Sequence, residues 1–463
     1  MIGICKLFEG IPHVKINCDV NVLGVSSHSS NVKPGDLFIA GNQEYIEDAR
    51  QKGAAAILSS KGTDIEYPRP RELEAILASR VYQDPSRFLY TVGITGTNGK
   101  STTTFMVQHL LKEMGLSSGL IGTIQYQIGE EIYTPTHTTP DICRNQFLFR
   151  QMVDRGMKAC VMEVTSHALS QGRVEGIAFD AAIFTQLTQD HLDYHGTMEA
   201  YARAKNLLFR KDVKTAIVNS GCPWHQKIIE GTKAKIITYG KGGDLQASLP
   251  SFHSFETTFN VRYKEESASV RSPFVGHFNV DNYLAACALG VSNGWSLKDV
   301  TGALSSAPPV PGRLEPIDNT LGISLFVDFA HTEDALENVL STLHSLKKGR
   351  LITVFGCGGD RDVGKRPKMA KVCEKFSDYC IITSDNPRSE NPEKIIQQIL
   401  SGFGPSVKYK AIVDRREAIR HAVSIARRED VVLIAGRGHE QTQIIGNEKI
   451  PFDDRVEARK ACE

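Results

Sequence analysis

The stretch at residues 90–114, YTVGITGTNGKSTTTFMVQHLLKEM, constrains the fold of this chain more than any other. It begins with a short apolar run rich in β-branched residues, Tyr90–Thr95, which predicts a strand. A glycine-rich turn follows, and from Ser101 onward apolar residues recur at helical spacing. Strand, glycine turn and helix in this order are the layout of a phosphate-binding loop.

The residue types of the turn fit that layout. Gly96 and Gly99 allow the backbone to approach phosphate oxygens, Lys100 supplies a positive charge, and the hydroxyl of Ser101 can hold Mg²⁺. The spacing departs from the common motif by one residue, because Gly93 lies six positions before Gly99. The alternative is a glycine turn that binds nothing. That alternative does not explain a lysine at position 100 of the turn, so nucleotide binding is predicted.

Length and composition set the class of protein. A chain of 463 residues predicts two to four domains, and 41% hydrophobic with 23% charged residues is ordinary for a globular protein. The net charge of +1 gives no electrostatic reason to expect a nucleic-acid or membrane partner. No apolar run of about eighteen residues is present, so a cytoplasmic protein is expected. The ten cysteines form no CxxC pair and are interpreted as reduced, mostly core thiols.

The order of predicted elements indicates an α/β protein. Short apolar runs after residue 89 alternate with helical patterns, which predicts a doubly wound, mostly parallel sheet with antiparallel strands near residues 245–263. A proline-rich hinge covers residues 306–316, and the alternation then restarts as a second open α/β sheet. Residues 1–88 form a separate first unit.

Polar residues follow several of these strands. Glu163 ends the run ACVME and is the first choice for a Mg²⁺ ligand, with helix capping as the alternative. His191, beside two acids in TQDHLDYHG, is either a second metal ligand or a structural donor. Since the carboxyl ends of parallel strands share one edge, both should lie near the phosphate loop. Lys205, in the helical run MEAYARAKNLLFR, is interpreted from the residues alone as a surface lysine.

Three strands of the last sheet also end in polar residues. They carry Arg361 in FGCGGDRD, residues 385–388 in SDNPRSENP, and Glu440 in AGRGHE. Arginine clamps a carboxylate with two parallel bonds while acids hold an ammonium, so the set suits a zwitterion. Each group alone could equally be a loop salt bridge.

Together these motifs resemble the Mur ligases. The residues that carry the resemblance are TGTNGKST, MEVTSH, FTQLTQDHLDYHGTMEAYARAK, GHFNVDNYLAA, PGRLE, VDFAHTEDAL, VFGCGGDRDVGKRP, DNPRSENP and AGRGHE, in family order from about residue 24. The resemblance implies three domains: 1–88, which binds the UDP-linked substrate; 89–312, the central P-loop domain with the doubly wound sheet; and 313–463, a Rossmann-like open sheet that binds an amino acid.

The resemblance also implies a reaction. ATP and Mg²⁺ would activate the D-glutamyl γ-carboxylate of UDP-N-acetylmuramoyl-L-alanyl-D-glutamate as an acyl phosphate. The amine of meso-2,6-diaminopimelate would then displace phosphate, yielding an amide, ADP and phosphate for peptidoglycan synthesis. A cytoplasmic monomer is expected, without a nucleic-acid or membrane partner.

The family pattern assigns residues to each ligand. For ATP it implies Gly96, Thr97, Asn98, Gly99, Lys100, Ser101, Thr102, Asn279, Asn282, Arg313 and Asp328. For metal it implies Ser101, Glu163, His191 and Lys205, the last carboxylated by CO₂ to a carbamate. For the UDP-linked substrate it implies Ser27, Ser29, Asn42, Gln43, Thr138, Thr139, Thr165, Gln171 and Arg173. For diaminopimelate it implies Arg361, Asp385, Asn386, Pro387, Arg388, Gly436 and Glu440.

The sequence departs from the family pattern in a few places. His28, Ser29 and Ser30 stand where DSR is usual, and the loop after Ala40 is short, which bears on the uracil and sugar contacts. Arg437 stands where lysine is usual. The alternatives are a lysine-adding relative, a folylpolyglutamate synthase and a non-catalytic nucleotide-binding regulator. Arg388 favours diaminopimelate over lysine, and Glu163 with Lys205 favours an enzyme.

Overall fold

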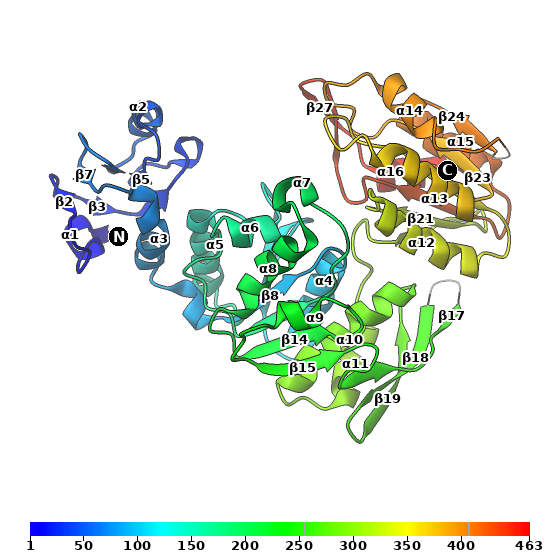
Figure 1. The fold of residues 1–463 in the computed structure, drawn as a ribbon, viewed down its shortest axis with the longest axis horizontal. Helices are drawn as coiled ribbons and strands as arrows, with labels where there is room; N and C mark the ends of the chain where they lie inside the picture. Colours follow the sequence, from blue (N-terminus) through cyan, green and yellow to red (C-terminus); the bar gives the residue numbers. More distant parts are fainter. Residues whose placement is uncertain (254–255, 406–407) are drawn as a thin grey trace. The chain divides into compact units, whose positions relative to one another are not determined.

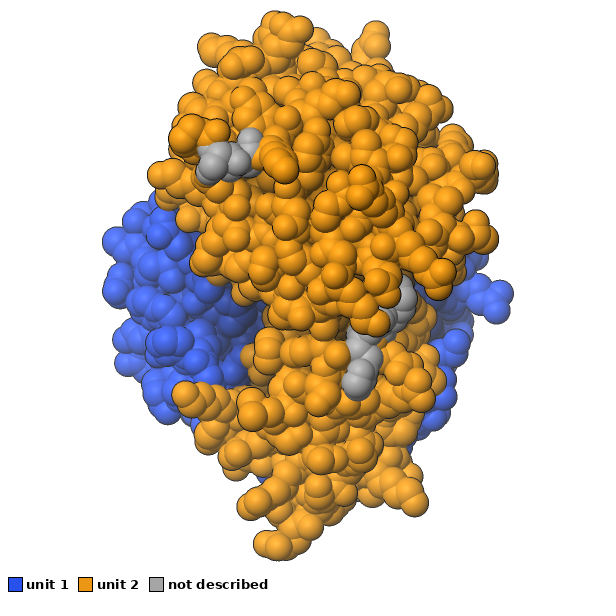
Figure 2. Space-filling view, turned by 90° about the vertical axis from the view of Figure 1, so that its right-hand side faces the viewer, with its two compact units in different colours: residues 1–100, 107–237 blue, residues 101–106, 238–463 orange. Residues whose placement is uncertain are grey.

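The computed structural model describes residues 1–253, 256–405 and 408–463. The chain divides into two compact units, one of residues 1–100 and 107–237 and the other of residues 101–106 and 238–463 (Figure 2). Each unit is an α/β structure with its own buried cores, so the predicted fold class is confirmed. The division into three domains stays a prediction.

The first unit begins with a five-stranded sheet in the order β2-β7-β6-β5-β4. Figure 1 draws this part of the chain in blue. Its strands are β2 Lys15–Ile16, β4 Gly24–Ser26, β5 Asp36–Ile39, β6 Ala56–Ser59 and β7 Ile65–Glu66. Strands β4 to β7 run parallel, and β2 is antiparallel to β7. Helices α1 Ile4–Leu7, α2 Ile46–Gln51 and α3 Glu74–Tyr82 accompany it, and the short strands β1 Ile2–Gly3 and β3 Asn21–Val22 pair with each other. Helix α2 is followed by Gly53, at φ +87°, which turns the chain into β6.

The phosphate-loop strand lies in the middle of a larger sheet. In the first unit the strand order is β11-β10-β9-β12-β8-β13-β14-β15. The bounds are β8 Tyr90–Thr95, β9 Ser118–Ile121, β10 Tyr126–Ile128, β11 Glu131–Tyr133, β12 Ala159–Glu163, β13 Ala181–Phe184, β14 Thr215–Asn219 and β15 Lys235–Tyr239. Strands β9, β12, β8, β13 and β14 are parallel, so their carboxyl ends meet at one edge.

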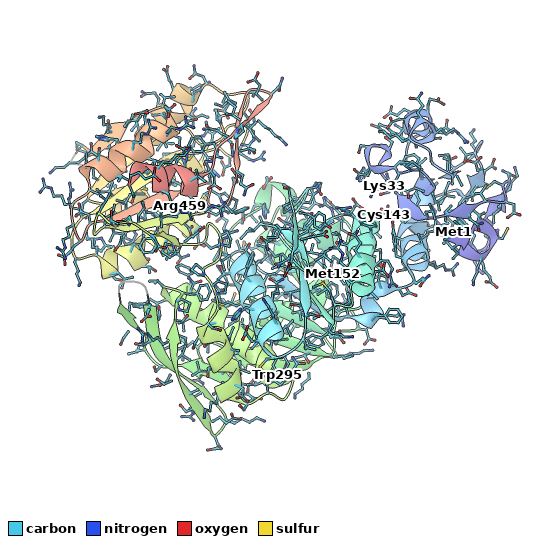
Figure 3. All side chains as sticks on the ribbon, turned by 180° about the vertical axis from the view of Figure 1, so that it is seen from behind. Met1, Lys33, Cys143, Met152, Trp295 and Arg459 are labelled. Carbon is cyan, nitrogen blue, oxygen red and sulfur yellow. The ribbon has the colours of Figure 1, made fainter. Side chains whose placement is uncertain are left out.

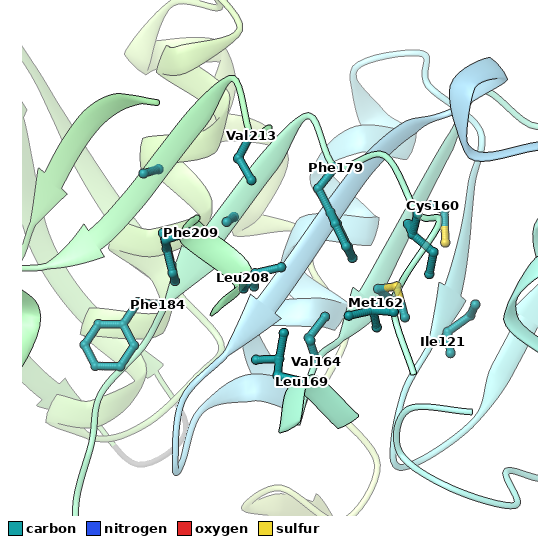
Figure 4. Packing of buried hydrophobic residues seen from close by; sticks show 14 of the residues in the cluster. Ile121, Cys160, Met162, Val164, Leu169, Phe179, Phe184, Leu208, Phe209 and Val213 are labelled. Carbon is teal, nitrogen blue, oxygen red and sulfur yellow. The ribbon is translucent and has the colours of Figure 1, made fainter. Parts of the chain in front are cut away.

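Helices alternate with these strands. They are α4 Lys100–Glu113, α5 Ile142–Asp154, α6 Ser166–Ser170, α7 Leu192–His195, α8 Met198–Phe209 and α9 His225–Ile228. Figure 3 labels Cys143 and Met152 on α5. The core of this part combines strand residues such as Met162 with helix residues such as Leu208 and Phe209 (Figure 4). Residues buried on both faces of a strand explain why these strands read as continuous apolar runs.

The second unit contains the predicted antiparallel strands and the last sheet. Strands β16 Leu245–Ala247, β17 Ser251–His253 and β19 Glu266–Ser272 each pair antiparallel with β18 Glu256–Tyr263. Helices α10 His277–Ser292 and α11 Leu297–Ser305 follow. The last sheet has the order β20-β21-β25-β22-β23-β24, parallel except for β20.

The strands of the last sheet are β20 Glu315–Ile317, β21 Ser324–Asp328, β22 Leu351–Phe355, β23 Tyr379–Ile382, β24 Tyr409–Ala411 and β25 Val431–Ala435. Its helices are α12 Glu333–Leu346, α13 Lys365–Phe376, α14 Pro392–Leu400, α15 Arg415–Ile425 and α16 Asp454–Ala461. A hairpin of β26 Thr442–Ile445 and β27 Glu448–Pro451 leaves the carboxyl side of β25.

The burial of the cysteines and the character of the helices can also be read from the structure. All ten cysteines lie in the described residues and are free, and seven of them are buried, which confirms the interpretation as mostly core thiols. Among the described residues, no helix has the length and apolar character needed to span a bilayer.

Candidate active site

The phosphate loop has the predicted geometry. It connects β8 to α4, and Gly96 has φ +156° and Gly99 φ +85°, conformations that favour glycine. A side chain at Gly96 is excluded as well, since its Cβ would lie 1.8 Å from Oγ1 of Thr185. Thr185 donates to the carbonyl of Asn98 at 2.6 Å and so fixes the turn from β13. The helix begins at Lys100, one residue before the predicted start at Ser101.

Two lysines converge on one carbonyl of this loop. Nζ of Lys100 donates to the carbonyls of Gly96 at 3.1 Å and Thr97 at 2.7 Å. Nζ of Lys205 donates to the same carbonyl of Gly96 at 2.8 Å. Both amines therefore lie at the point where the motif predicts phosphate, and Lys100 supplies the positive charge there.

Lys205 is buried, so its interpretation as a surface lysine is wrong. Its side chain on α8 is 1% exposed and lies over the ring of Tyr201, 4.6 Å from the centroid. Burial, followed by the positive charge of Lys100, holds the pKa of Lys205 well below its ordinary value. The sequence carried a signal: Tyr201 at i−4 and Leu208 at i+3 are apolar, which places Lys205 on the inward face of the helix.

Glu163 lies at the same edge of the sheet. In the parallel pair of β12 and β8 it is opposite Ile94, and it is fully buried. Thr123 donates to it twice, from its backbone N–H at 2.9 Å and from its hydroxyl at 3.0 Å. A carboxylate has about four acceptor positions, so this leaves room for an ion. The buried, fixed carboxylate fits Mg²⁺ better than the alternative of a helix cap, because Thr165 caps the following helix instead.

His191 stands at the start of α7 with φ +52°. Its Nε2 lies 3.4 Å from Oδ2 of Asp190, and its ring makes an edge contact with His167, with centroids 4.8 Å apart. Burial is the main cause that lowers the pKa of His191, and the positive charges of Lys100 and Lys205 add to it. A neutral imidazole is the form that binds metal.

In the second unit, Ser101 and the hinge are connected. Nη2 of Arg313 donates to the hydroxyl of Ser101 at 3.1 Å, and the guanidinium lies over the ring of Phe329. Asp328 accepts from the N–H of Leu314 at 2.5 Å, and burial raises the pKa of its carboxyl. The structure thus brings Ser101, Arg313 and Asp328 into one region.

The predicted adenine-side asparagines lie on α10. Asn282 accepts from the hydroxyl of Thr103 at 3.2 Å and donates to Oδ1 of Asn279 at 3.0 Å. Asn279 donates in turn to the carbonyl of Val275 at 2.8 Å. Thr102, beside this group on α4, is buried.

Most of the residues predicted for the UDP-linked substrate lie around Glu163. The hydroxyl of Thr138 is 3.0 Å from that of Thr123, and Thr139 donates to the carbonyl of Glu163 at 2.9 Å. The N–H of Thr165 donates to Thr139 at 3.1 Å, and Arg173 donates to the carbonyl of Thr139 at 3.2 Å. Gln171 follows helix α6 and reaches the hydroxyl of Tyr194 at 3.4 Å.

The four remaining predicted residues lie after two neighbouring parallel strands. Ser27 and Ser29 follow β4, and Asn42 and Gln43 follow β5. Arg71 connects the two loops: it donates to the carbonyl of Ser27 at 2.6 Å, and its Nε lies 2.8 Å from the Cβ position of Gly41. The sequence analysis did not select Arg71, because nothing around it marks it as more than a surface cation.

The predicted amino-acid site is assembled at the carboxyl edge of the last sheet. Asn386 donates to Oε2 of Glu440 at 2.8 Å. A Cβ on Gly436 would lie 2.7 Å from Oδ2 of Asp385, so this position requires a small residue. Burial, followed by the negative charge of Asp385, raises the pKa of Glu440.

Two arginines lie beside Gly358. A Cβ on Gly358 would lie 2.9 Å from Nη1 of Arg388 and 3.7 Å from Cγ of Arg361. Arg388, after Pro387, has φ +50° and donates to the carbonyl of Gly359 at 2.7 Å. The seven residues predicted for diaminopimelate therefore come together within one region of the second unit.

Two residues that support these arginines were missed. Arg366 is fully buried and donates two hydrogen bonds to the carboxylate of Glu390, at 2.8 and 2.9 Å. It also donates to the carbonyl of Gly358. Glu390 also accepts from the N–H of Asp360 at 2.6 Å. These bonds tie the loop after β22 to the loop after β23. Both residues stand in the quoted motifs VFGCGGDRDVGKRP and DNPRSENP, but their pairing across 24 residues could not be read from the sequence.

The comparisons with known proteins agree with this geometry. The Mur ligase middle domain matches residues 94–290, and the Mur ligase, glutamate ligase domain matches residues 312–438. A UDP-N-acetylmuramoyl-L-alanyl-D-glutamate–2,6-diaminopimelate ligase of Geobacillus kaustophilus is 42% identical over 463 residues, covering 95% of each chain.

Solved structures give the same result. A structure of a UDP-N-acetylmuramoyl-L-alanyl-D-glutamate–2,6-diaminopimelate ligase matches with a TM-score of 0.71 and 33% identity, over 100% of this chain and 98% of the other. The MurF ligase of Thermotoga maritima, solved in complex with ADP, has a TM-score of 0.67 at 18% identity, over 89% of this chain and 93% of that one, and shows the shared fold. Fold and site together define an α/β ligase with a phosphate-binding loop. The chain belongs to the Mur ligase family.

Proposed function

We propose that this chain joins meso-2,6-diaminopimelate to UDP-N-acetylmuramoyl-L-alanyl-D-glutamate with consumption of ATP, in peptidoglycan precursor synthesis. The observation that carries the proposal is the amino-acid site, where Asn386 donates to Glu440 from the turn that also carries Asp385 and Arg388. The Geobacillus kaustophilus relative, 42% identical to this chain, is named for this activity. We further propose three domains, at residues 1–88, 89–312 and 313–463, in a cytoplasmic monomer.

The phosphate loop would bind ATP. Its glycine turn at Gly96 and Gly99 and the amine of Lys100 fit a polyanion. Ser101 and Glu163 would hold Mg²⁺, which neutralises charge on the phosphates during transfer. The γ-carboxylate of the substrate takes the γ-phosphoryl group, and the amino-acid amine then displaces phosphate from the acyl phosphate. Around this chemistry the chain orients reactants and stabilises charge.

Lys205 has the chemistry expected of a carbamate-forming lysine. CO₂ reacts with a neutral amine, and burial with a neighbouring cation favours the neutral form of Lys205. The product would be an anionic oxygen ligand beside His191, suitable for a second Mg²⁺. The modification would also place an anion next to Lys100.

Arg388 supports diaminopimelate over lysine. The two amino acids differ by one carboxylate, which a guanidinium binds with two charge-assisted bonds. The test is phosphate release from ATP by the purified protein with UDP-N-acetylmuramoyl-L-alanyl-D-glutamate and each amino acid in turn. Release that depends on meso-diaminopimelate is expected. Equal release with L-lysine would indicate a lysine-adding relative, and release with a folate and L-glutamate would indicate a folylpolyglutamate synthase.

A further inference from the structure

The residue behind the amino-acid site is a buried arginine, Arg437. It follows β25 and is 0% exposed. Its Nη1 donates to Oδ1 of Asn386 at 3.1 Å, and its Nη2 donates to the carbonyls of Thr442 at 2.8 Å and Phe452 at 3.2 Å. Burial, followed by the charge of Arg415, lowers the pKa of Arg437. Burying a cation costs free energy unless hydrogen bonds compensate it, so the partners of Arg437 are informative.

The bond to Asn386 decides which way that amide points. Oδ1 of Asn386 accepts from Arg437 and also from the N–H of Ile444 at 2.8 Å, while Nδ2 donates to Glu440. The reversed amide would set its NH₂ against two donors and its oxygen against a carboxylate. Arg437 therefore keeps the donating side of Asn386 on Glu440.

The orientation of Asn386 matters for the ammonium of an amino acid. With Nδ2 on Oε2 of Glu440, the carboxylate is fixed and Oε1 remains for a ligand. Asn386 and Arg437 both lower the pKa of Glu440, against burial and Asp385, which raise it. They therefore favour the charged form that binds an ammonium.

We infer that Arg437 is a positioning residue for the amino-acid substrate, acting through Asn386 on Glu440. The inference rests on the proposed function. Arginine suits this task because one nitrogen of its fork holds Asn386 and the other holds the two ends of the β26–β27 hairpin. A lysine ammonium is a single point charge and cannot reproduce the two arms of the fork.

The test is a double-mutant cycle of Arg437→Met and Asn386→Ala, with KM measured for all three substrates. We expect Arg437→Met to raise KM for meso-diaminopimelate about tenfold, the scale of one hydrogen bond to a charged group, while KM for ATP and the UDP-dipeptide changes less than about twofold. In the Asn386→Ala background, Arg437→Met should add almost nothing. Additive effects, or equal increases in all three KM values, would overturn the inference.

A pH profile gives a second readout that a purely structural role would leave unchanged. Loss of Arg437 removes two influences that lower the pKa of Glu440, so the acidic limb of kcat/KM for diaminopimelate should move to higher pH. An unshifted limb in a folded variant contradicts the inference. If Arg437→Met does not fold, Arg437→Lys retains the buried charge but not the fork, and should still show the raised KM with a smaller shift of the limb.

Controls separate this inference from the proposed function. Arg350→Met removes another arginine of the second unit, one paired with Asp430 at 2.6 Å and outside the site, and should leave all three KM values unchanged. A wild-type protein without diaminopimelate-dependent phosphate release would overturn the proposed function and this inference together. Wild-type release combined with an additive cycle would overturn the inference alone.

Discussion

The phosphate-loop region and the amino-acid site differ in how their charged side chains are paired. At the loop, Lys100 and Lys205 direct two amines at one carbonyl, that of Gly96. At the amino-acid site, Asn386 bonds Glu440. The loop therefore gains most from an anion that a ligand or a modification supplies, whereas the amino-acid site is already ordered. Substitutions at the phosphate loop should therefore change mainly kcat, because they remove charge neutralisation. Substitutions at the amino-acid site should change mainly the selectivity for the amino acid, because they remove hydrogen-bond partners of that substrate.

The largest effects are expected at the phosphate loop. Lys100→Ala and Glu163→Ala should each lower kcat hundreds-fold, about 3–4 kcal/mol of barrier, since each removes charge stabilisation at the transferring phosphoryl group. Steady-state phosphate release measures this, and circular dichroism checks the fold. The matched control is Glu175→Ala, which removes a surface carboxylate paired with Lys211. Near-normal turnover of a folded Glu163→Ala protein would remove Glu163 from the metal site.

Lys205→Ala should be nearly inactive and should recover part of its activity with added short carboxylates, which refill the anionic position. Because the pKa of Lys205 is lowered well below its usual value, carbamate formation should proceed at neutral pH. Activity assays with formate or acetate, and density or ¹³CO₂ NMR for the carbamate, check this. The control is Lys214→Ala, an exposed lysine. Full activity of Lys205→Ala without additive would contradict the carbamate.

At the amino-acid site, Arg388→Ala should reduce selectivity rather than the phosphoryl-transfer step. With lysine bound, a guanidinium without a carboxylate partner costs several kcal/mol, so wild type should prefer diaminopimelate by orders of magnitude in kcat/KM. Arg388→Ala should lose diaminopimelate activity mainly through KM, and Arg388→Lys should recover little. The assignment is wrong if wild type uses lysine equally well, or if Arg388→Ala lowers both activities alike.

The smallest effect concerns the ion pair of the buried Arg366 with the half-buried Glu390. Glu390→Gln weakens the link between the loops of Arg361 and Arg388, and should raise KM for diaminopimelate severalfold with kcat little changed. The pKa of Glu390 is lowered from 4.5 to about 2, chiefly by Arg366.

A lowered carboxyl pKa means that the ionised form stabilises the fold. The contribution of Glu390 is therefore complete above pH 4.5 and is lost as the pH falls toward about 2. Unfolding by urea across this range should show a shallower loss of stability in Glu390→Gln than in wild type. Glu393→Gln, an exposed neighbour, is the control. An identical pH dependence in Glu390→Gln and wild type would contradict the role of the pair.

Local patterns determined much of this protein. The run Tyr90–Thr95 with its glycine turn predicted the loop, because strand, turn and helix form from neighbouring residues. Parallel strands have their carboxyl ends at one edge, so Glu163 could be placed beside the loop from sequence alone. The apolar runs after the hinge predicted the last sheet for the same reason.

Tertiary structure alone decided which polar groups meet. The apolar residues Tyr201 and Leu208 indicated that Lys205 lies on the inward face of its helix, but only the structure shows that its amine reaches the distant carbonyl of Gly96. Thr123 holds Glu163, Arg366 holds Glu390, and Arg437 orients Asn386 across separations of 24 to 51 residues. Sequence periodicity reports only which face of an element is apolar. Hydrogen-bond partners between elements depend on how the loops after different strands fold against one another.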